Sequence, residues 1–169
     1  MTETLGYQLV EKLGVVEIRR YSKFLMMATF DSGSLASAGN RSFSRLANFI
    51  FGGNDLGQKI AMTAPVTQRR VDSGYETGFV MPAAISLDQL PTTRDGSLQF
   101  REEPGGLYGA ITFSGLADDR LFESRTKRLL KILQDSGKEV SGEPIYARYN
   151  GPWTPFFLRR NEVLVPIAQ

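Results

Sequence analysis

Residues 98–133 read LQFREEPGGLYGAITFSGLADDRLFESRTKRLLKIL, and the order of elements in this stretch indicates the architecture of the whole chain. Segments 98–102 and 107–113 flank a Pro-Gly-Gly turn, and the alternation of apolar residues in the second segment predicts a strand with one buried face. Asp118 favours the start of a helix, whose apolar residues recur at helical spacing until Gly137. The stretch therefore predicts a β-hairpin followed by an amphipathic helix.

The same order of elements occurs earlier, so the chain contains two similar halves, about residues 7–82 and 97–168. In the first half, Ser34 can cap a helix that Gly52 and Gly53 end. Eight segments rich in β-branched and aromatic residues are predicted as strands: 15–21, 24–30, 60–69, 75–81, 98–102, 107–113, 145–149 and 163–167. The first three pairs of successive strands are predicted to form hairpins. Each half has the predicted order strand, strand, helix, strand, strand.

These elements predict an α+β fold. We expect a distorted eight-stranded antiparallel barrel built from the two pseudo-symmetric halves, with one helix packed on each half. A chain of 169 residues is long enough to bury one sizeable core. Residues 1–169 are therefore expected to form a single domain, in which segment 83–94 links the halves and neither half is stable alone.

The sequence contains neither cysteine nor histidine. This composition excludes disulfides, thiolate nucleophiles, Ser-His-Asp triads, histidine-ligated haem and Cys/His zinc sites. The net charge of +2 does not indicate nucleic-acid binding, and an anionic small molecule fits it at least as well. No stretch is long and apolar enough to span a membrane, and the N-terminus shows no secretion signal, so a cytoplasmic location is expected.

Several charged or glycine-rich motifs favour structural roles over catalysis. The glycine-rich segment 52–59 follows a predicted helix and leads into a strand, whereas a phosphate loop leads into a helix, so it predicts a turn. Carboxylates at 102–103 would point to opposite faces of a strand, and those at 118–119 are natural capping residues. Arginine pairs lie near strand ends at 19–20, 69–70 and 159–160. Surface charge is their usual role, with a ligand contact as the alternative.

The first predicted helix carries a candidate binding face. Arg41 and Arg45 lie four residues apart beside Phe49, and this face can either hold an acidic planar ligand or be solvated. Met62 and three other methionines fall in or beside predicted strands. Such thioethers usually fill core gaps, with a soft ligand lining or iron ligation as the alternative.

The connection 151–157 concentrates Trp153, Phe156 and Phe157 between prolines. Large apolar side chains on a proline-braced loop have fewer core partners than those on a strand. The loop therefore either packs onto its own sheet, forms the lip of a ligand groove, or presents an apolar surface to a protein partner.

Several motifs resemble one protein family when they are taken together. They are Tyr7, VEIRRY at 16–21, the segment 43–54, IAMTAPV at 60–66, FVMP at 79–82, ARY at 147–149, PWTP at 152–155 and RRNEV at 159–163. Their combination spans nearly the whole chain and resembles the SOUL haem-binding protein family. That family is in turn similar to effector-binding domains of the gyrase-inhibitor type.

The resemblance implies a barrel of two pseudo-symmetric halves that binds tetrapyrroles in a shallow apolar groove beside the first helix and the late aromatic loop, here residues 41–51 and 151–157. Because the chain has no histidine, any haem would be held by apolar contacts and propionate pairing, or ligated by Tyr, Met or Lys. The gyrase-inhibitor relatives hold varied small molecules in the analogous cleft, and some hydrolyse reactive electrophiles with cleft carboxylates.

Our hypothesis is a haem- or tetrapyrrole-binding protein that holds a hydrophobic anionic ligand without histidine ligation. The candidate cofactor-binding residues are Arg41, Arg45, Phe49, Met62, Trp153, Phe156 and Phe157. The aromatic residues would cover the macrocycle, and the two arginines would pair with its propionates. The alternative is a small-molecule effector-binding protein, or a hydrolase of a reactive electrophile. A carboxylate with a raised pKa, deep in an apolar cleft beside a tyrosine, would favour the hydrolase.

Overall fold

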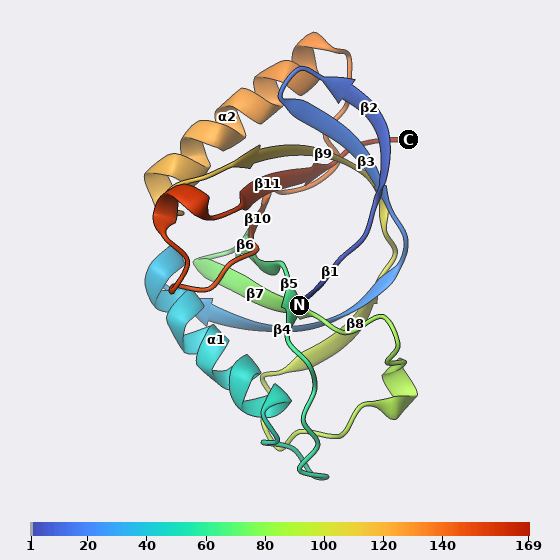
Figure 1. Ribbon diagram of the computed structural model, residues 1–169, viewed down its shortest axis with the longest axis vertical. Coiled ribbons are helices and arrows are strands. Elements are labelled where there is room, and N and C mark those ends of the chain that lie inside the picture. Colours follow the sequence, from blue (N-terminus) through green and yellow to red (C-terminus); the bar gives the residue numbers. More distant parts are fainter. Residues whose placement is uncertain (1) are drawn as a thin grey trace. The chain divides into compact units, whose positions relative to one another are not determined.

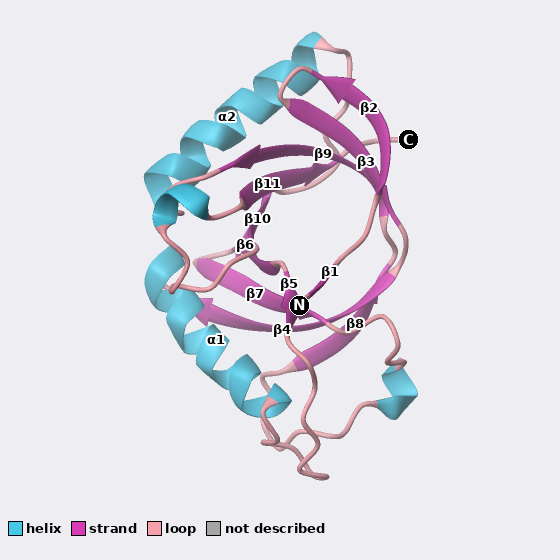
Figure 2. Ribbon diagram, viewed as in Figure 1, coloured by secondary structure: helices cyan, strands magenta, loops and turns pink. Residues whose placement is uncertain are grey.

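The structure is a computed structural model that describes residues 2–169 (Figure 1). Its contacts divide the chain into two units. Unit 1 comprises residues 2–5 and Lys23–Pro104, and unit 2 comprises Gly6–Ser22 and Gly105–Gln169. Each unit therefore takes one short segment from the start of the chain and a longer segment from one half. Both units combine antiparallel strands with one long helix, which confirms the predicted α+β class (Figure 2).

Unit 1 is a four-stranded antiparallel sheet of order β6-β7-β4-β8, on which α1 packs. Its elements are β1 (Glu3–Thr4), β4 (Phe24–Ser32), α1 (Leu35–Ile50), β5 (Thr63–Ala64), β6 (Val66–Val71), β7 (Gly74–Val80) and β8 (Gln99–Glu103), with a short 3-10 helix at Leu87–Gln89. The small strands β1 and β5 pair in parallel. Buried Met27, Leu46, Phe49 and Phe79 form the centre of its core, where the apolar stripe of α1 meets one face of the sheet.

Unit 2 has the corresponding sheet, of order β2-β3-β9-β11-β10, with α2 packed on β9 and β11. Its elements are β2 (Gln8–Leu13), β3 (Val16–Tyr21), β9 (Gly106–Phe113), α2 (Asp119–Asp135), β10 (Ile145–Arg148) and β11 (Asn161–Pro166), with a 3-10 helix at Phe156–Leu158. Buried Phe122 stacks on Tyr146 at 4.3 Å between ring centroids. A β-carbon at Gly109 would lie 2.9 Å from Leu133, so the glycine lets α2 approach the sheet closely.

Several local predictions are confirmed. The Ser34 side chain caps α1 by accepting a hydrogen bond from the Ser37 amide, and Asp118 caps α2 through the Leu121 amide. Gly52 follows the end of α1 with a φ of 109°, as expected of a glycine that ends a helix. The predicted hairpin between residues 60–69 and 75–81 is present as β6 and β7.

The first and third predicted hairpins are wrong. β3 lies between β2 and β9, and β4 lies between β7 and β8, so the successive strands β3 and β4 do not pair. For the same reason β8 does not pair with β9. At each of these two links, the chain leaves one unit and enters the other. Alternation identifies the buried face of a strand but not its neighbour, which explains the error.

Two further differences concern strand boundaries. β2 was not predicted because its residues are almost all exposed, so the sequence shows no buried face there. Pro65 interrupts the predicted strand at 60–69, because proline has no amide hydrogen for the sheet, and only residues 63–64 and 66–71 are strand. Closure of the strands into an eight-stranded barrel, the single domain and the halves 7–82 and 97–168 stay predictions.

None of the helices among residues 2–169 combines the length and apolarity needed to cross a membrane. The predicted cytoplasmic location and the predicted absence of a nucleic-acid partner stay predictions.

Candidate ligand-binding regions

An open cavity of about 760 Å³ lies within unit 1, at the C-terminal end of α1. Its lining comes from α1, from the loop that follows it and from the segment before β8: Ser44, Arg45, Asn48, Phe49, Gly53, Asn54, Thr93, Arg94, Asp95 and Leu98. The volume is in the range of small-molecule sites. Two of the predicted site residues, Arg45 and Phe49, thus line one cavity.

Arg45 is already engaged by its own unit. Its guanidinium donates to both carboxylate oxygens of Asp31, at 2.7 and 3.3 Å, and to the Thr29 hydroxyl at 2.8 Å. The Nε atom is buried without a hydrogen bond, 3.9 Å from a carboxylate oxygen of Asp95. Burial alone would raise the pKa of Asp31, but hydrogen bonds from Ser42 and Arg45 and the charges of the nearby arginines lower it.

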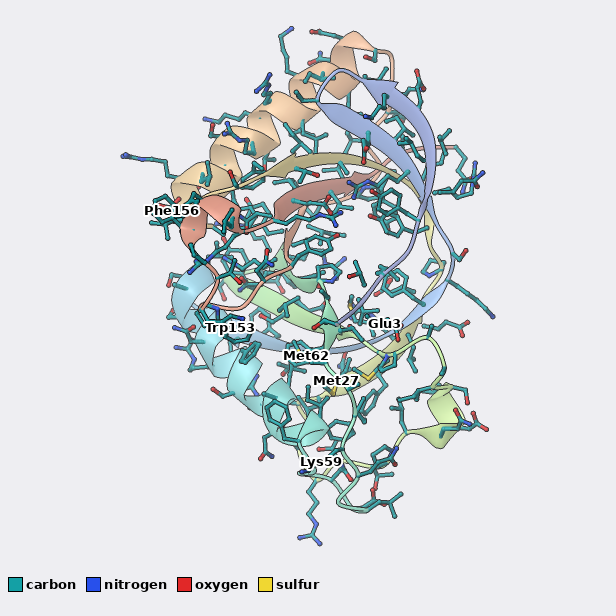
Figure 3. The ribbon with its side chains drawn as sticks, in the orientation of Figure 1. Glu3, Met27, Lys59, Met62, Trp153 and Phe156 are labelled. Carbon is teal, nitrogen blue, oxygen red and sulfur yellow. The ribbon has the colours of Figure 1, made fainter. Side chains whose placement is uncertain are left out.

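Arg41 lies beside Arg45 on α1, as predicted, but is half exposed. It donates to the Ser32 carbonyl at 2.5 Å, and its Nε lies 3.6 Å from Asp31. Phe49 is fully buried in the core and contacts Phe100 at 5.2 Å between ring centroids. Met62 is partly buried and packs against the same core, close to Met27 (Figure 3). These four residues therefore differ widely in how much surface they can offer to a ligand.

The aromatic loop of unit 2 is the most exposed apolar feature among the predicted site residues. Trp153 is 84% exposed, Phe156 54% and Phe157 62%. Leu116 and Leu158, which are neighbours in sequence of Gly115 and Phe157, are also exposed. The alternative in which the loop packs its aromatic residues onto its own sheet does not hold.

The loop is nevertheless held in place by hydrogen bonds. Arg159 donates to the carbonyls of Thr154, at 2.8 Å, and Pro152, at 3.0 Å. The Gly115 amide donates to the Phe156 carbonyl at 2.9 Å. A β-carbon at Gly151 would lie 2.2 Å from the Trp153 ring, so the ring packs against bare backbone. Rigid exposed aromatic groups suit ligand binding because little conformational entropy is lost when they are covered.

Sequence reasoning missed a buried polar network in unit 2 that centres on Glu162. This carboxylate is fully buried and forms a bidentate pair with Arg19, at 2.7 and 3.0 Å. It also accepts hydrogen bonds from Thr112 at 2.7 Å, Tyr149 at 2.5 Å and Arg160 at 3.1 Å. All of its acceptor sites are therefore used within unit 2.

Charge and burial act in opposite directions within this network. Burial would raise the pKa of Glu162, but the hydrogen bonds and charge of Arg19, aided by Tyr149 and Thr112, hold it below its ordinary value. Burial, followed by the charge of Glu162, raises the pKa of Tyr149. Burial likewise raises the pKa of Tyr21, to about 12, against the opposing effect of Arg19. The network thus keeps an ionised carboxylate beside two neutral phenols.

The other arginine and carboxylate motifs have mainly structural partners. Arg19 is buried rather than a surface charge, while Arg69 pairs with Glu76 at 3.4 Å and Arg159 braces the aromatic loop. The signal that could have revealed Glu162 is a charged residue inside an apolar strand, since such a residue is rarely buried without a partner. Among residues 2–169, no cluster of His, Cys, Asp or Glu could hold a metal ion.

The fold of the chain is shared with several solved structures. It is similar to the EcmrR C-terminal domain, with a TM-score of 0.71 and 12% identity over 96% of this chain and 98% of that one. A hydrolase from Listeria innocua matches with a TM-score of 0.64 and 7% identity, over 90% of this chain and 91% of that one. SAV2435 bound to tetraphenylphosphonium matches with a TM-score of 0.56 and 9% identity, over 96% and 94%. At such low identity these likenesses concern the fold alone.

The sequence then defines the family. The model of the SOUL heme-binding protein family matches residues 2–166, so the chain belongs to this family and the predicted resemblance is confirmed. The chain is also similar to Heme-binding protein 2 of Homo sapiens, with 29% identity over 175 residues that cover 95% of this chain and 84% of that protein.

Proposed function

We propose that this chain binds a tetrapyrrole non-covalently, with one face of the macrocycle covered by the aromatic loop of unit 2. The observation that carries the proposal is the exposed, hydrogen-bonded group of Trp153, Phe156 and Phe157 in a member of a haem-binding family. Covering such a group removes a large apolar area from water, which favours binding of a flat hydrophobic ligand. The ligand class is thus a hydrophobic macrocycle with acidic substituents.

The ring geometry indicates how much contact area each of the three aromatic residues can provide. The rings of Phe156 and Phe157 lie 5.5 Å apart and perpendicular to each other, so only one of them can lie flat against a planar ligand. The Trp153 ring packs on Gly151 and leaves a broad apolar surface uncovered. We expect Trp153 to provide the largest share of contact area, with one phenylalanine flat and the other at the ligand edge.

The residues fit a macrocycle better than they fit its iron. The chain has no histidine or cysteine, and burial raises the pKa of Tyr149 and Tyr21, which disfavours the phenolate form that ligates iron. Met62 packs against the core of unit 1. When haem is bound, its iron supplies redox and ligand-binding chemistry, but we propose that affinity comes from the porphyrin. Metal-free protoporphyrin is therefore expected to bind about as well as haem.

Arg41 and Arg45 of α1 belong to unit 1, and their predicted pairing with propionates stays a prediction. Arg41 is half exposed and lies 3.6 Å from Asp31, so its guanidinium can be shared with an incoming carboxylate. Arg45 is held more tightly, at 2.7 Å from the same carboxylate.

The alternative function, hydrolysis of a reactive electrophile, would be favoured by a carboxylate with a raised pKa. Asp31, Glu76, Asp95 and Glu162, the carboxyls whose pKa values depart from the ordinary range, all have lowered values. Glu162 does lie beside a tyrosine, but it is ionised and fully hydrogen-bonded, which makes it a poor proton donor or acceptor. This supports binding rather than catalysis as the proposed function.

Titration of the purified protein with haemin, followed by absorbance of the haem band, tests the proposal. A tryptophan buries about 150–250 Å² when covered; covering one face of Trp153 would remove roughly 80 Å² from water, worth about 2 kcal/mol. Trp153→Ala should therefore weaken haemin binding by about 30-fold. Leu87→Ala, which removes an exposed apolar side chain of unit 1, is the matched control and should leave the affinity unchanged.

Two results would refute the proposal. One is a titration of the native chain that does not saturate. The other is an equal affinity for the native chain, Trp153→Ala and the double variant Phe156→Ala/Phe157→Ala, since a ligand bound elsewhere would not respond to the loop.

A further inference from the structure

The cavity of unit 1 is a second candidate site, built from other residues than the aromatic loop on which the tetrapyrrole proposal rests. Its lining residues all belong to Lys23–Pro104, whereas the loop belongs to unit 2. Phe49 and Leu98, which are both part of the core of unit 1, lie at its apolar base, where Phe49 is fully buried and Leu98 is 7% exposed. The polar groups around this base determine what the cavity can hold.

The walls of the cavity are fixed by hydrogen bonds. Asn54 donates to the Phe49 and Gln58 carbonyls and accepts from the Gln58 amide at 2.9 Å, so it shapes the loop after α1. Asp55 and Thr92 are joined by two hydrogen bonds, of 2.7 and 3.1 Å, which tie this loop to the segment before β8. The cavity is thus built before any ligand arrives, as is usual for small-molecule sites.

The Nε of Arg45 is buried on the wall without a hydrogen bond. The Arg94 guanidinium and the Asn48 side-chain amide also line the cavity, are exposed, and have no hydrogen-bond acceptor among residues 2–169. Arg45 is shared with Asp31 and lies 3.9 Å from Asp95, so most of its charge is compensated. Arg94 has no ion-pair partner in the described chain and keeps its full charge at the cavity mouth.

The carboxylate of Asp95, which also lines the cavity, does not cancel the positive charge of the two arginines. Asp95 accepts hydrogen bonds from the Ser97 amide, at 2.9 Å, and the Ser97 hydroxyl, at 2.5 Å, and it faces Arg45. The lining therefore carries two cations and one carboxylate that already has partners. A monoanion is favoured over a cation or a neutral molecule, and a planar guanidinium suits a carboxylate because it can donate two parallel hydrogen bonds.

We propose that this cavity binds a small organic monocarboxylate, with its carboxylate on Arg94 and Asn48 and its apolar body towards Leu98. Gly53 supports the geometry, because a β-carbon there would lie 2.4 Å from the Asn48 amide nitrogen. The bare backbone of Gly53 thus lets the Asn48 amide stay at the wall. Asn48 acts as a second donor beside Arg94.

Benzoate and its uncharged analogue benzamide are the probes, and backbone amide signals of the ¹⁵N-labelled full chain are the readout. Benzoate should shift the signals of Gly53, Asn54 and Gly96 in a saturable manner, and benzamide should bind at least about tenfold more weakly. Arg94→Gln should weaken benzoate binding by about tenfold or more. Arg120→Gln, which changes an exposed arginine of α2, should have no effect.

The proposal is overturned if benzoate does not saturate these signals, if benzamide shifts them equally well, or if Arg94→Gln leaves the affinity unchanged. Arg94 is exposed, so the variant should fold, and its own amide spectrum verifies this. Trp153→Ala should bind benzoate normally. A failed haemin titration would therefore leave this site standing, and a failed benzoate titration would leave the tetrapyrrole site standing.

Discussion

Replacing Glu162 by glutamine measures how far the buried polar network stabilises unit 2. The side chain is fully buried and is the shared partner of Arg19, Arg160, Tyr149 and Thr112. Glutamine has nearly the same shape, but it is neutral and turns an NH2 group towards donors. Arg19, which is also buried, would then keep only the partly exposed carboxylate of Glu17, at 2.8 Å, as a counter-charge.

The free energy of unfolding should decrease substantially, because removing the charge of Glu162 leaves the charge of Arg19 buried. Breaking a buried ion pair by removing one partner costs about 3–5 kcal/mol. Since Glu17 still pairs with Arg19 and the substituted glutamine can still accept a hydrogen bond, we expect the lower end of this range, about 3 kcal/mol. For a chain of this length, this corresponds to a decrease of roughly 6–12 °C in the midpoint of thermal unfolding.

Urea unfolding of both proteins, followed by circular dichroism, gives the difference directly. The matched control is Glu102→Gln, because Glu102 is exposed and lies 3.8 Å from an equally exposed Lys23. Such a surface pair contributes only about 0–1 kcal/mol. A loss of less than about 1 kcal/mol for Glu162→Gln, or equal losses for the two variants, would contradict the role assigned to the network.

Two further predictions concern pH and strand packing. Because the pKa values of Glu162 and Glu76 are lowered by folding, the stability they provide is complete above the ordinary glutamate value of 4.5 and is lost as the pH falls through the folded values. The free energy of unfolding should therefore fall below about pH 4.5, more steeply for the native chain than for Glu162→Gln, and parallel pH profiles would be inconsistent with this. Gly74→Ala should destabilise the chain by about 1–3 kcal/mol in urea, because its β-carbon would lie 2.1 Å from the Asp31 carbonyl. Gly96→Ala, with no atom within 4 Å, should change stability by less than about 0.5 kcal/mol, and equal effects would count against the register of β4 and β7.

The helix starts could be predicted because helix capping involves residues that are close together in the sequence. Ser34 and Asp118 cap the helices by bonding amides three residues away, so the sequence around each cap contains the whole interaction. Strand partners are different, because they depend on distant segments. The pairing of β3 with β9 and of β4 with β8 could not be inferred from residues 15–30, whose alternation is compatible with a hairpin.

The same distinction applies to the candidate sites. The exposed aromatic loop was predictable because prolines and aromatic residues are adjacent in the sequence. Glu162 was not, since its role depends on Arg19, 143 positions away. The cavity of unit 1 escaped prediction because Asp55 and Thr92 join two loops that are far apart in the sequence, and segment 83–94 was interpreted only as a linker.

Affinity for metal-free protoporphyrin IX, measured beside haemin, tests the central claim most directly. Trp153 is the sole tryptophan, so saturable quenching of its fluorescence gives the dissociation constant of each ligand. We predict saturable quenching by both ligands, with similar dissociation constants, because the loop covers the macrocycle and no histidine or cysteine ligates the iron. Quenching by haemin without binding of protoporphyrin IX, or no saturable quenching by either ligand, would contradict the account.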